Sequence, residues 1–125
     1  MNELITKAIQ MMKKARAPYS NYSVGAAIKI DEKTIVGGCN IENASYPATV
    51  CGEDVAIFKA ISEGETKIDT IAVACIDAEN DTAIFPCGIS RQRMSEFNTE
   101  SVIVVHNDEF KKYKFEEVLP FDFKF

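Results

Sequence analysis

The chain has 125 residues, of which 46% are hydrophobic and 26% charged, and its formal net charge is −5 at pH 7. This size and composition are typical of globular proteins and predict a single domain, residues 1–125. No apolar run is long enough to span a bilayer, and the lysines are scattered rather than gathered into the basic patch of a nucleic-acid-binding protein. We therefore expect a small-molecule partner, and neither a membrane nor a nucleic acid.

Helix-like and strand-like segments alternate from the first residues onward. Apolar residues at helical spacing predict a helix over residues 3–15, which Pro18 ends. Two β-prone runs, residues 23–30 and 34–40, flank the polar turn DEKT and predict an antiparallel hairpin. The segment IENASYPAT, residues 41–49, is expected to be a loop.

The second half of the chain continues this alternation. A helix is expected from near Cys51 to Gly64, a natural C-terminal cap. DTIAVACID predicts a buried strand, a polar turn then leads into a helix starting near Cys87, and SVIVVHN predicts a further strand. The tail FEEVLPFDFKF is expected to contain a short helical turn. This order, with a hairpin only at the first strand pair, predicts a mixed sheet covered by helices in a three-layer α/β/α fold.

The compartment follows from the N-terminal residues and the cysteines. The start, MNELITKAIQ, lacks the basic and apolar stretches of a secretory signal, so the cytoplasm is the expected location. The four cysteines are then expected to be reduced, because disulfides are rare in the cytosol. Metal ligation or burial must account for them.

Two Cys-Gly pairs stand at the predicted starts of two helices, in CGE (residues 51–53) and PCGIS (residues 86–90). A helix N-terminus favours the thiolate form that binds metal, so Cys51 and Cys87 are candidate zinc ligands. Glu53 is placed to move protons beside such a metal. Taken singly, each cysteine is better explained as a core residue; taken together, with Glu53 and Pro86, they favour a metal site.

These half-motifs read C-x-E and P-C-x-x-S, close to the signature of the zinc deaminases. With APYSNYSVGAA, GGCNIENASYPATVCGE, AIFKAISEG, PCGISRQ and LPFDF, they make nearly the whole chain resemble the small cytidine deaminases. The resemblance implies a pyrimidine-salvage hydrolase that assembles as a homotetramer. It also implies that zinc activates a water to attack C4 of cytosine in cytidine or deoxycytidine, while Glu53 moves protons and ammonia leaves.

The resemblance also implies substrate-binding roles. Asn40 and Glu42 are expected on the ribose, and Tyr22, where phenylalanine is usual, against the pyrimidine. Phe123 is expected to close a pocket from its own or a neighbouring subunit. For the ribose the residues themselves agree, because an amide and a carboxylate suit a vicinal diol and alternate onto one side of an extended strand end.

Ser90 and Asp54 depart from the family pattern, which has a third cysteine and, in three-cysteine members, an arginine at these positions. Zinc–oxygen bonds, about 2.0–2.2 Å, are shorter than zinc–sulfur bonds of about 2.3 Å, so a serine oxygen falls short unless the loop moves. With three thiolates the zinc site has one excess negative charge, which a nearby arginine offsets. With two thiolates the site is neutral, so no arginine is needed. We hypothesise that the two changes are coupled and that Asp54, on the same helix face as Cys51, is the third ligand. Ser90 or a water are the alternatives.

Two other functions stay open at this point: a nucleoside-binding pseudoenzyme, or an aminohydrolase of a modified cytosine or another amino-heterocycle. Outside the site, Cys39 and Cys75 are expected to be buried structural thiols, and His106 a hydrogen-bonded histidine at a strand end. Exposed aromatic clusters are costly in water, so burial against the body or a neighbour is expected for phenylalanines 121, 123 and 125.

Overall fold

Five strands form one mixed sheet in the computed structural model, which describes residues 2–125. Their spatial order is β2-β1-β3-β4-β5, and only β3 and β4 run parallel. The prediction of a mixed sheet is confirmed. The strands are β1 (Gly25–Lys29), β2 (Ile35–Cys39), β3 (Thr70–Ala74), β4 (Ser101–His106) and β5 (Glu109–Lys114).

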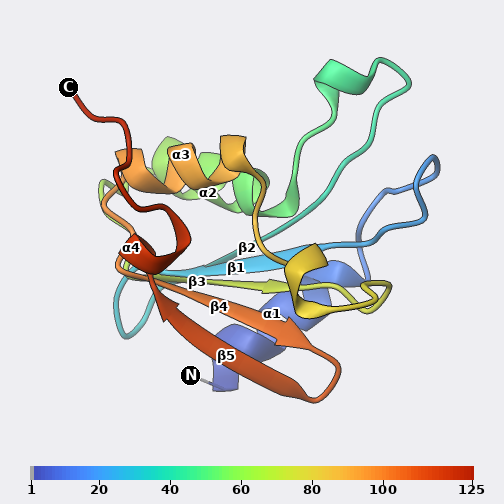
Figure 1. Ribbon diagram of the computed structural model, residues 1–125, viewed down its shortest axis with the longest axis horizontal. Helices are drawn as coiled ribbons and strands as arrows, with labels where there is room; N and C mark the ends of the chain where they lie inside the picture. Colours follow the sequence, from blue (N-terminus) through green and yellow to red (C-terminus); the bar gives the residue numbers. More distant parts are fainter. Residues whose placement is uncertain (1) are drawn as a thin grey trace.

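Helices cover both faces of this sheet (Figure 1). One face carries α1, and the opposite face carries α2 and α3, which lie side by side. The three-layer α/β/α prediction is confirmed. The helical segments are α1 (Asn2–Met12), η1 (Tyr46–Ala48), α2 (Gly52–Ser62), η2 (Asp81–Ala83), α3 (Gly88–Glu96) and α4 (Phe115–Val118).

The two helical layers draw on alternate residues of the same strands. Successive side chains of a strand point to opposite faces, so Ala27 packs with Leu4 of α1, whereas Ile28 packs with Ile57 and Met94 of the other layer. All five side chains are buried. The sheet is therefore buried on both faces near its centre. The two helices that begin at the half-motifs, α2 and α3, pack against one of these faces.

The strand register brings both site loops to one end of the sheet. Gly25 lies opposite Cys39 of β2 on one side and opposite Ala74 of β3 on the other. The segments that leave these two strand ends, residues 40–51 and 75–87, lead to the first residues of α2 and α3. The two Cys-Gly pairs, which are 36 residues apart in sequence, therefore meet at one edge.

The structure contains a strand that the sequence analysis missed. Strand β5 pairs antiparallel with β4, so the expectation of a hairpin at the first strand pair alone is wrong. Its side chains are almost all exposed and include three lysines, so it lacks the apolar alternation by which strands are recognised. Lysines of this kind are typical of edge strands. The connecting turn is marked by Asn107, whose φ is 58°.

Other expectations outside the site have mixed outcomes. Helix α4 confirms the short helical turn, and His106 is hydrogen-bonded to the Asp81 carboxylate (2.9 Å) and the Ala78 carbonyl (3.2 Å). Cys75 is buried as expected, whereas Cys39 is partly exposed. Burial of the C-terminal phenylalanines against their own chain is wrong, because all three are exposed. Within residues 2–125, no helix combines the length and apolarity needed to cross a membrane.

Candidate active site

A cavity of about 370 Å³ opens where α2 and α3 begin. Most of the predicted site residues line it, although they come from four separate segments of the chain. Phe123 does not line it, and its side chain is 65% exposed. Asp54 also lies off the cavity wall, buried between the two helices. The predicted residues on the wall are Tyr22, Asn40, Glu42, Cys51, Glu53 and Cys87.

The two candidate thiol ligands occupy equivalent positions. Cys51 is the N-cap of α2 and Cys87 is the N-cap of α3, and their sulfurs are 3.9 Å apart. A tetrahedral zinc ion with bonds of about 2.3 Å to sulfur separates two sulfur ligands by ~3.8 Å. The two thiols therefore fit as two ligands of one zinc ion.

The acidity of the two thiols differs. Burial raises the pKa of Cys51 to about 12, and the charge of Glu53 adds to this effect. Burial also opposes ionisation of Cys87, but hydrogen bonds, foremost from the Ser90 backbone N–H, outweigh it and lower the pKa of Cys87. The expectation that both helix N-termini favour the thiolate is therefore wrong at Cys51, where desolvation exceeds the helix-dipole effect.

Glu53 follows Cys51 by two residues and faces the same cavity. Its side chain is only 4% exposed. Burial raises the pKa of Glu53 to about 7, and the charge of Asp54 contributes in the same direction. A carboxyl group with this pKa gains and loses a proton readily near neutral pH, as a general acid–base catalyst must.

Asp54, the hypothesised third ligand, points toward α3. Its Oδ2 accepts hydrogen bonds from Arg93 Nη1 at 2.6 Å and from Ser90 Oγ at 3.1 Å. Its Oδ1 is buried and has no hydrogen-bond partner. Across residues 2–125, no three His, Cys, Asp or Glu side chains converge closely enough to hold a metal ion. Asp54 therefore lies between the two helices that begin after Cys51 and Cys87, but its carboxylate is not grouped with the two thiols.

Arg93 is a site residue that sequence reasoning missed. The expectation that this site dispenses with an arginine is wrong, because Arg93 forms an ion pair with Asp54. It comes from α3 rather than from the position after Glu53. Its one signal in the sequence was its place three residues after Ser90, on the same face of the predicted helix. The spacing indicates that Arg93 and Ser90 share one face of α3, but it does not indicate that Arg93 pairs with an acid on α2.

Asn40 and Tyr22 are linked to one another and to the cavity wall. The Asn40 side chain accepts a hydrogen bond from the Val24 N–H (2.9 Å) and donates one to the Tyr22 carbonyl (2.7 Å). The Tyr22 hydroxyl donates to the Ala83 carbonyl at 2.9 Å, across the cavity. Burial raises the pKa of Tyr22 to about 12, so the hydroxyl stays protonated. One amide hydrogen of Asn40 remains for a ligand.

Glu42 is held by the segment before β1. Its carboxylate accepts hydrogen bonds from the backbone N–H groups of Tyr19 (2.9 Å) and Ser20 (3.1 Å), and also from the Ser20 hydroxyl. These bonds, with the hydroxyl foremost, lower the pKa of Glu42. The cavity therefore has an ionised hydrogen-bond acceptor at its mouth. Ser20 is a second residue that sequence reasoning missed.

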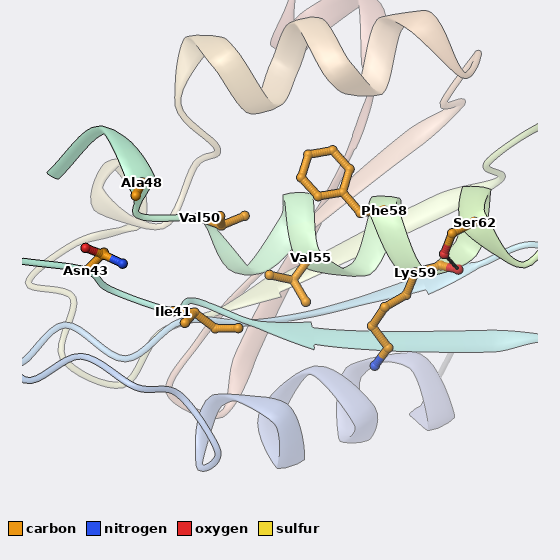
Figure 2. Close-up of a pocket in the computed structure, with 8 residues that line it drawn as sticks. All are labelled: Ile41, Asn43, Ala48, Val50, Val55, Phe58, Lys59 and Ser62. Carbon is orange, nitrogen blue, oxygen red and sulfur yellow. Dashed lines mark hydrogen bonds between the residues drawn. The ribbon is translucent and has the colours of Figure 1, made fainter. Parts of the chain in front are cut away.

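A second hollow, of about 380 Å³, lies where α2 meets the segment before it (Figure 2). Its volume is slightly larger than the 370 Å³ of the first cavity, so size does not identify the active site. Chemistry does, because Lys59 is the one charged residue of its lining and no carboxylate or thiol faces it. We therefore assign the active site to the first cavity. The residues of the second hollow are Ile41, Asn43, Ala48, Val50, Val55, Phe58, Lys59 and Ser62.

Comparisons with known proteins show the family of the chain. Residues 1–106 match the family model described as "Cytidine and deoxycytidylate deaminase zinc-binding region". The chain is 45% identical over 93 residues to a cytidine deaminase of Halalkalibacterium halodurans, covering 74% of this chain and 68% of the relative. It is 34% identical over 126 residues to a cytidine deaminase of Mycoplasma genitalium, covering 98% and 95%. A solved cytidine deaminase from Burkholderia pseudomallei superposes with a TM-score of 0.89 at 34% identity, covering 98% of both chains.

Proposed function

Because the chain belongs to the cytidine and deoxycytidylate deaminase family, we propose that it is a zinc-dependent hydrolase of cytidine or deoxycytidine. The reaction converts the nucleoside and water to uridine or deoxyuridine and ammonia, as a step of pyrimidine salvage. The observation that carries the proposal is the position of Glu53, buried on the wall of a cavity that two facing thiols also line.

Cys51 and Cys87 are the proposed metal ligands, with a third donor from the Asp54–Ser90 pair. A bound zinc ion would supply Lewis-acid activation of a water molecule. Glu53 takes a proton from the attacking water and delivers it to the departing amino nitrogen, so the leaving group is ammonia. Its raised pKa suits both directions of this transfer near neutral pH.

Substrate binding is proposed to use the residues around the cavity mouth. Glu42 accepts hydrogen bonds from the ribose hydroxyls, and Asn40 donates its remaining amide hydrogen. Tyr22 packs against the pyrimidine. Because Phe123 is exposed and lies away from the cavity of its own chain, we propose that it closes the cavity of a neighbouring subunit in a homotetramer.

The proposed location is the cytoplasm. The two candidate ligands are free cysteines with sulfurs 3.9 Å apart. Such thiols bind metal only in the reduced state, which the cytosol maintains.

The test is a deamination assay on the purified chain, in which the absorbance of cytidine changes as uridine forms. We expect turnover by the wild type, and Glu53→Gln should lower it by about a hundredfold to ten-thousandfold while the fold is retained. Glu63→Gln is the matched control, because it makes the same change at the exposed end of the same helix. Cytidine binding without turnover in the wild type would instead identify a pseudoenzyme, and full activity of Glu53→Gln would refute the proton-transfer role.

A further inference from the structure

Three side chains form a polar chain between α3 and α2. Arg93 and Ser90 both donate to Oδ2 of Asp54, at 2.6 and 3.1 Å. Ser90 is 0% exposed and Asp54 is 1% exposed, so the shared carboxylate lies away from solvent. We propose that Arg93 and Asp54 position the Ser90 oxygen as the third donor to the metal ion held by Cys51 and Cys87. This inference rests on the proposed function, which supplies the metal.

The distance from Ser90 to Cys87 suits Ser90 as a third metal ligand. Ser90 Oγ is 3.6 Å from Cys87 Sγ, and Cys87 Sγ is 3.9 Å from Cys51 Sγ. A tetrahedral zinc ion with sulfur at about 2.3 Å and oxygen at about 2.0–2.2 Å requires ~3.6 Å between a sulfur and an oxygen ligand. The Ser90–Cys87 distance therefore already matches the spacing of two ligands on one zinc ion.

The hydrogen-bond direction leaves the serine oxygen available. A hydroxyl has one hydrogen and two lone pairs, and Ser90 gives its hydrogen to Asp54. Its lone pairs remain for another partner on the side of Cys87. Carboxylates commonly orient metal ligands by a hydrogen bond of this kind. Asp54 is therefore a positioning residue for Ser90.

Arg93 stabilises the buried Asp54 carboxylate between α2 and α3. An unpaired charge in this position is costly, and the guanidinium neutralises it. The guanidinium carbon also lies 5.0 Å from the centre of the Phe58 ring, a cation–π contact that fixes its place. Ser90 and Asp54 are thus coupled, as the sequence suggested, but with the ligand role on the serine.

The test uses the full chain loaded with zinc or with cobalt(II). Zinc affinity is measured by competition with a chelator, and the absorption of the cobalt form reports the number of sulfur ligands. We expect Ser90→Ala and Asp54→Ala each to weaken zinc binding by at least about tenfold. The double variant Ser90→Ala/Asp54→Ala should bind zinc only slightly more weakly than Ser90→Ala alone, because Asp54 acts through Ser90. Ser90→Cys should strengthen the sulfur charge-transfer absorption of the cobalt form.

Ser95→Ala is the matched control, because Ser95 is also buried on α3 but bonds Asp122 instead. It should leave zinc affinity and the cobalt spectrum unchanged. An unchanged cobalt spectrum in Ser90→Cys would overturn the inference. A further loss of tenfold or more when Asp54→Ala is added to Ser90→Ala would also overturn it, by showing direct ligation by Asp54. Absence of stoichiometric zinc in the wild type would refute the proposed function itself, whereas zinc binding that ignores position 90 would refute this inference alone.

Discussion

The same dipeptide, Cys-Gly, begins two neighbouring helices, and its surroundings differ at the two positions. At α2, Gly52 is packed so closely that an added Cβ would lie 3.1 Å from the Val24 carbonyl oxygen and 3.3 Å from the Asn40 nitrogen. At α3, nothing lies within 4 Å of the same atom of Gly88. The pKa of Cys51 is raised by burial, and that of Cys87 is lowered by hydrogen bonds.

This difference shows what sets the acidity of a cysteine at a helix N-terminus. Both thiols are at a positive helix end, so the dipole alone predicts equal behaviour. Burial removes water from Cys51 and Glu53 at the start of α2, whereas the start of α3 stays open to solvent at Cys87. The balance between desolvation and hydrogen bonding therefore decides the acidity of each thiol, and three measurements distinguish the two helix ends.

The largest expected effect concerns the buried carboxyl group at the start of α2. The folded chain holds the Glu53 proton with a pKa of about 7, against an ordinary value of 4.5. Unfolding therefore releases this proton between these pH values, and the free energy of unfolding of the metal-free protein should fall as pH rises through this window, by about 3 kcal/mol. Denaturant unfolding of chelator-treated protein at pH 5 and pH 8 measures the change.

Glu53→Gln should remove most of this pH dependence and be the more stable protein at pH 8. Glu63→Gln, at the exposed end of α2, should retain the wild-type behaviour. The desolvation account of α2 fails if wild type and Glu53→Gln show the same slope with pH.

A smaller effect is expected from the paired glycines. Gly52→Ala should lower the free energy of unfolding by about 1–3 kcal/mol, because the new methyl group meets fixed backbone atoms. Gly88→Ala meets open space and should be neutral or stabilising by up to about 1 kcal/mol. Urea midpoints of the two variants give the comparison directly. Equal costs would show that the two helix ends are packed alike.

The smallest expected effect is a difference in thiol reactivity. In the metal-free protein at pH 8, a pKa of about 12 leaves about one Cys51 thiol in ten thousand ionised. Cys87 should therefore react with iodoacetamide faster by about tenfold or more, the gap being reduced because more basic thiolates are better nucleophiles. Peptide mapping by mass spectrometry follows each site, with the buried Cys75 as a slow reference. Similar rates at positions 51 and 87 would contradict the assigned acidities.

Much of the site was predictable because its residues lie in short contiguous motifs. CGE and PCGIS each lie at a helix start, and their joint resemblance to the zinc deaminase signature predicted one site for Cys51, Glu53 and Cys87, which line one cavity. The pairing of Arg93 with Asp54 was not predictable, because Arg93 lies outside both half-motifs and nothing in the sequence connects it with an acid on another helix. The raised pKa of Cys51 also depends on packing from distant segments, which no local pattern encodes.

The fold likewise contains parts that local sequence patterns predict and one strand that they do not. Helices and buried strands follow from periodic apolar residues, so both helical layers and four of the five strands were expected. Strand β5 lies at the sheet edge with polar side chains on most positions, so its presence depends on backbone pairing with β4. A strand of that kind carries no hydrophobic signal in its own residues.

The hydrogen bonds around Glu42 bear on the affinity for a nucleoside in the ribose-binding role proposed for this residue. The backbone of this segment is tied to Arg16, with Glu42 N–H donating to the Arg16 carbonyl at 2.8 Å and Arg16 N–H donating to the Asn40 carbonyl at 3.0 Å. The acceptor atoms are thus fixed by folding, before any ligand arrives. The conformational entropy of ordering this loop is lost once, during folding, and is not subtracted from the affinity for substrate.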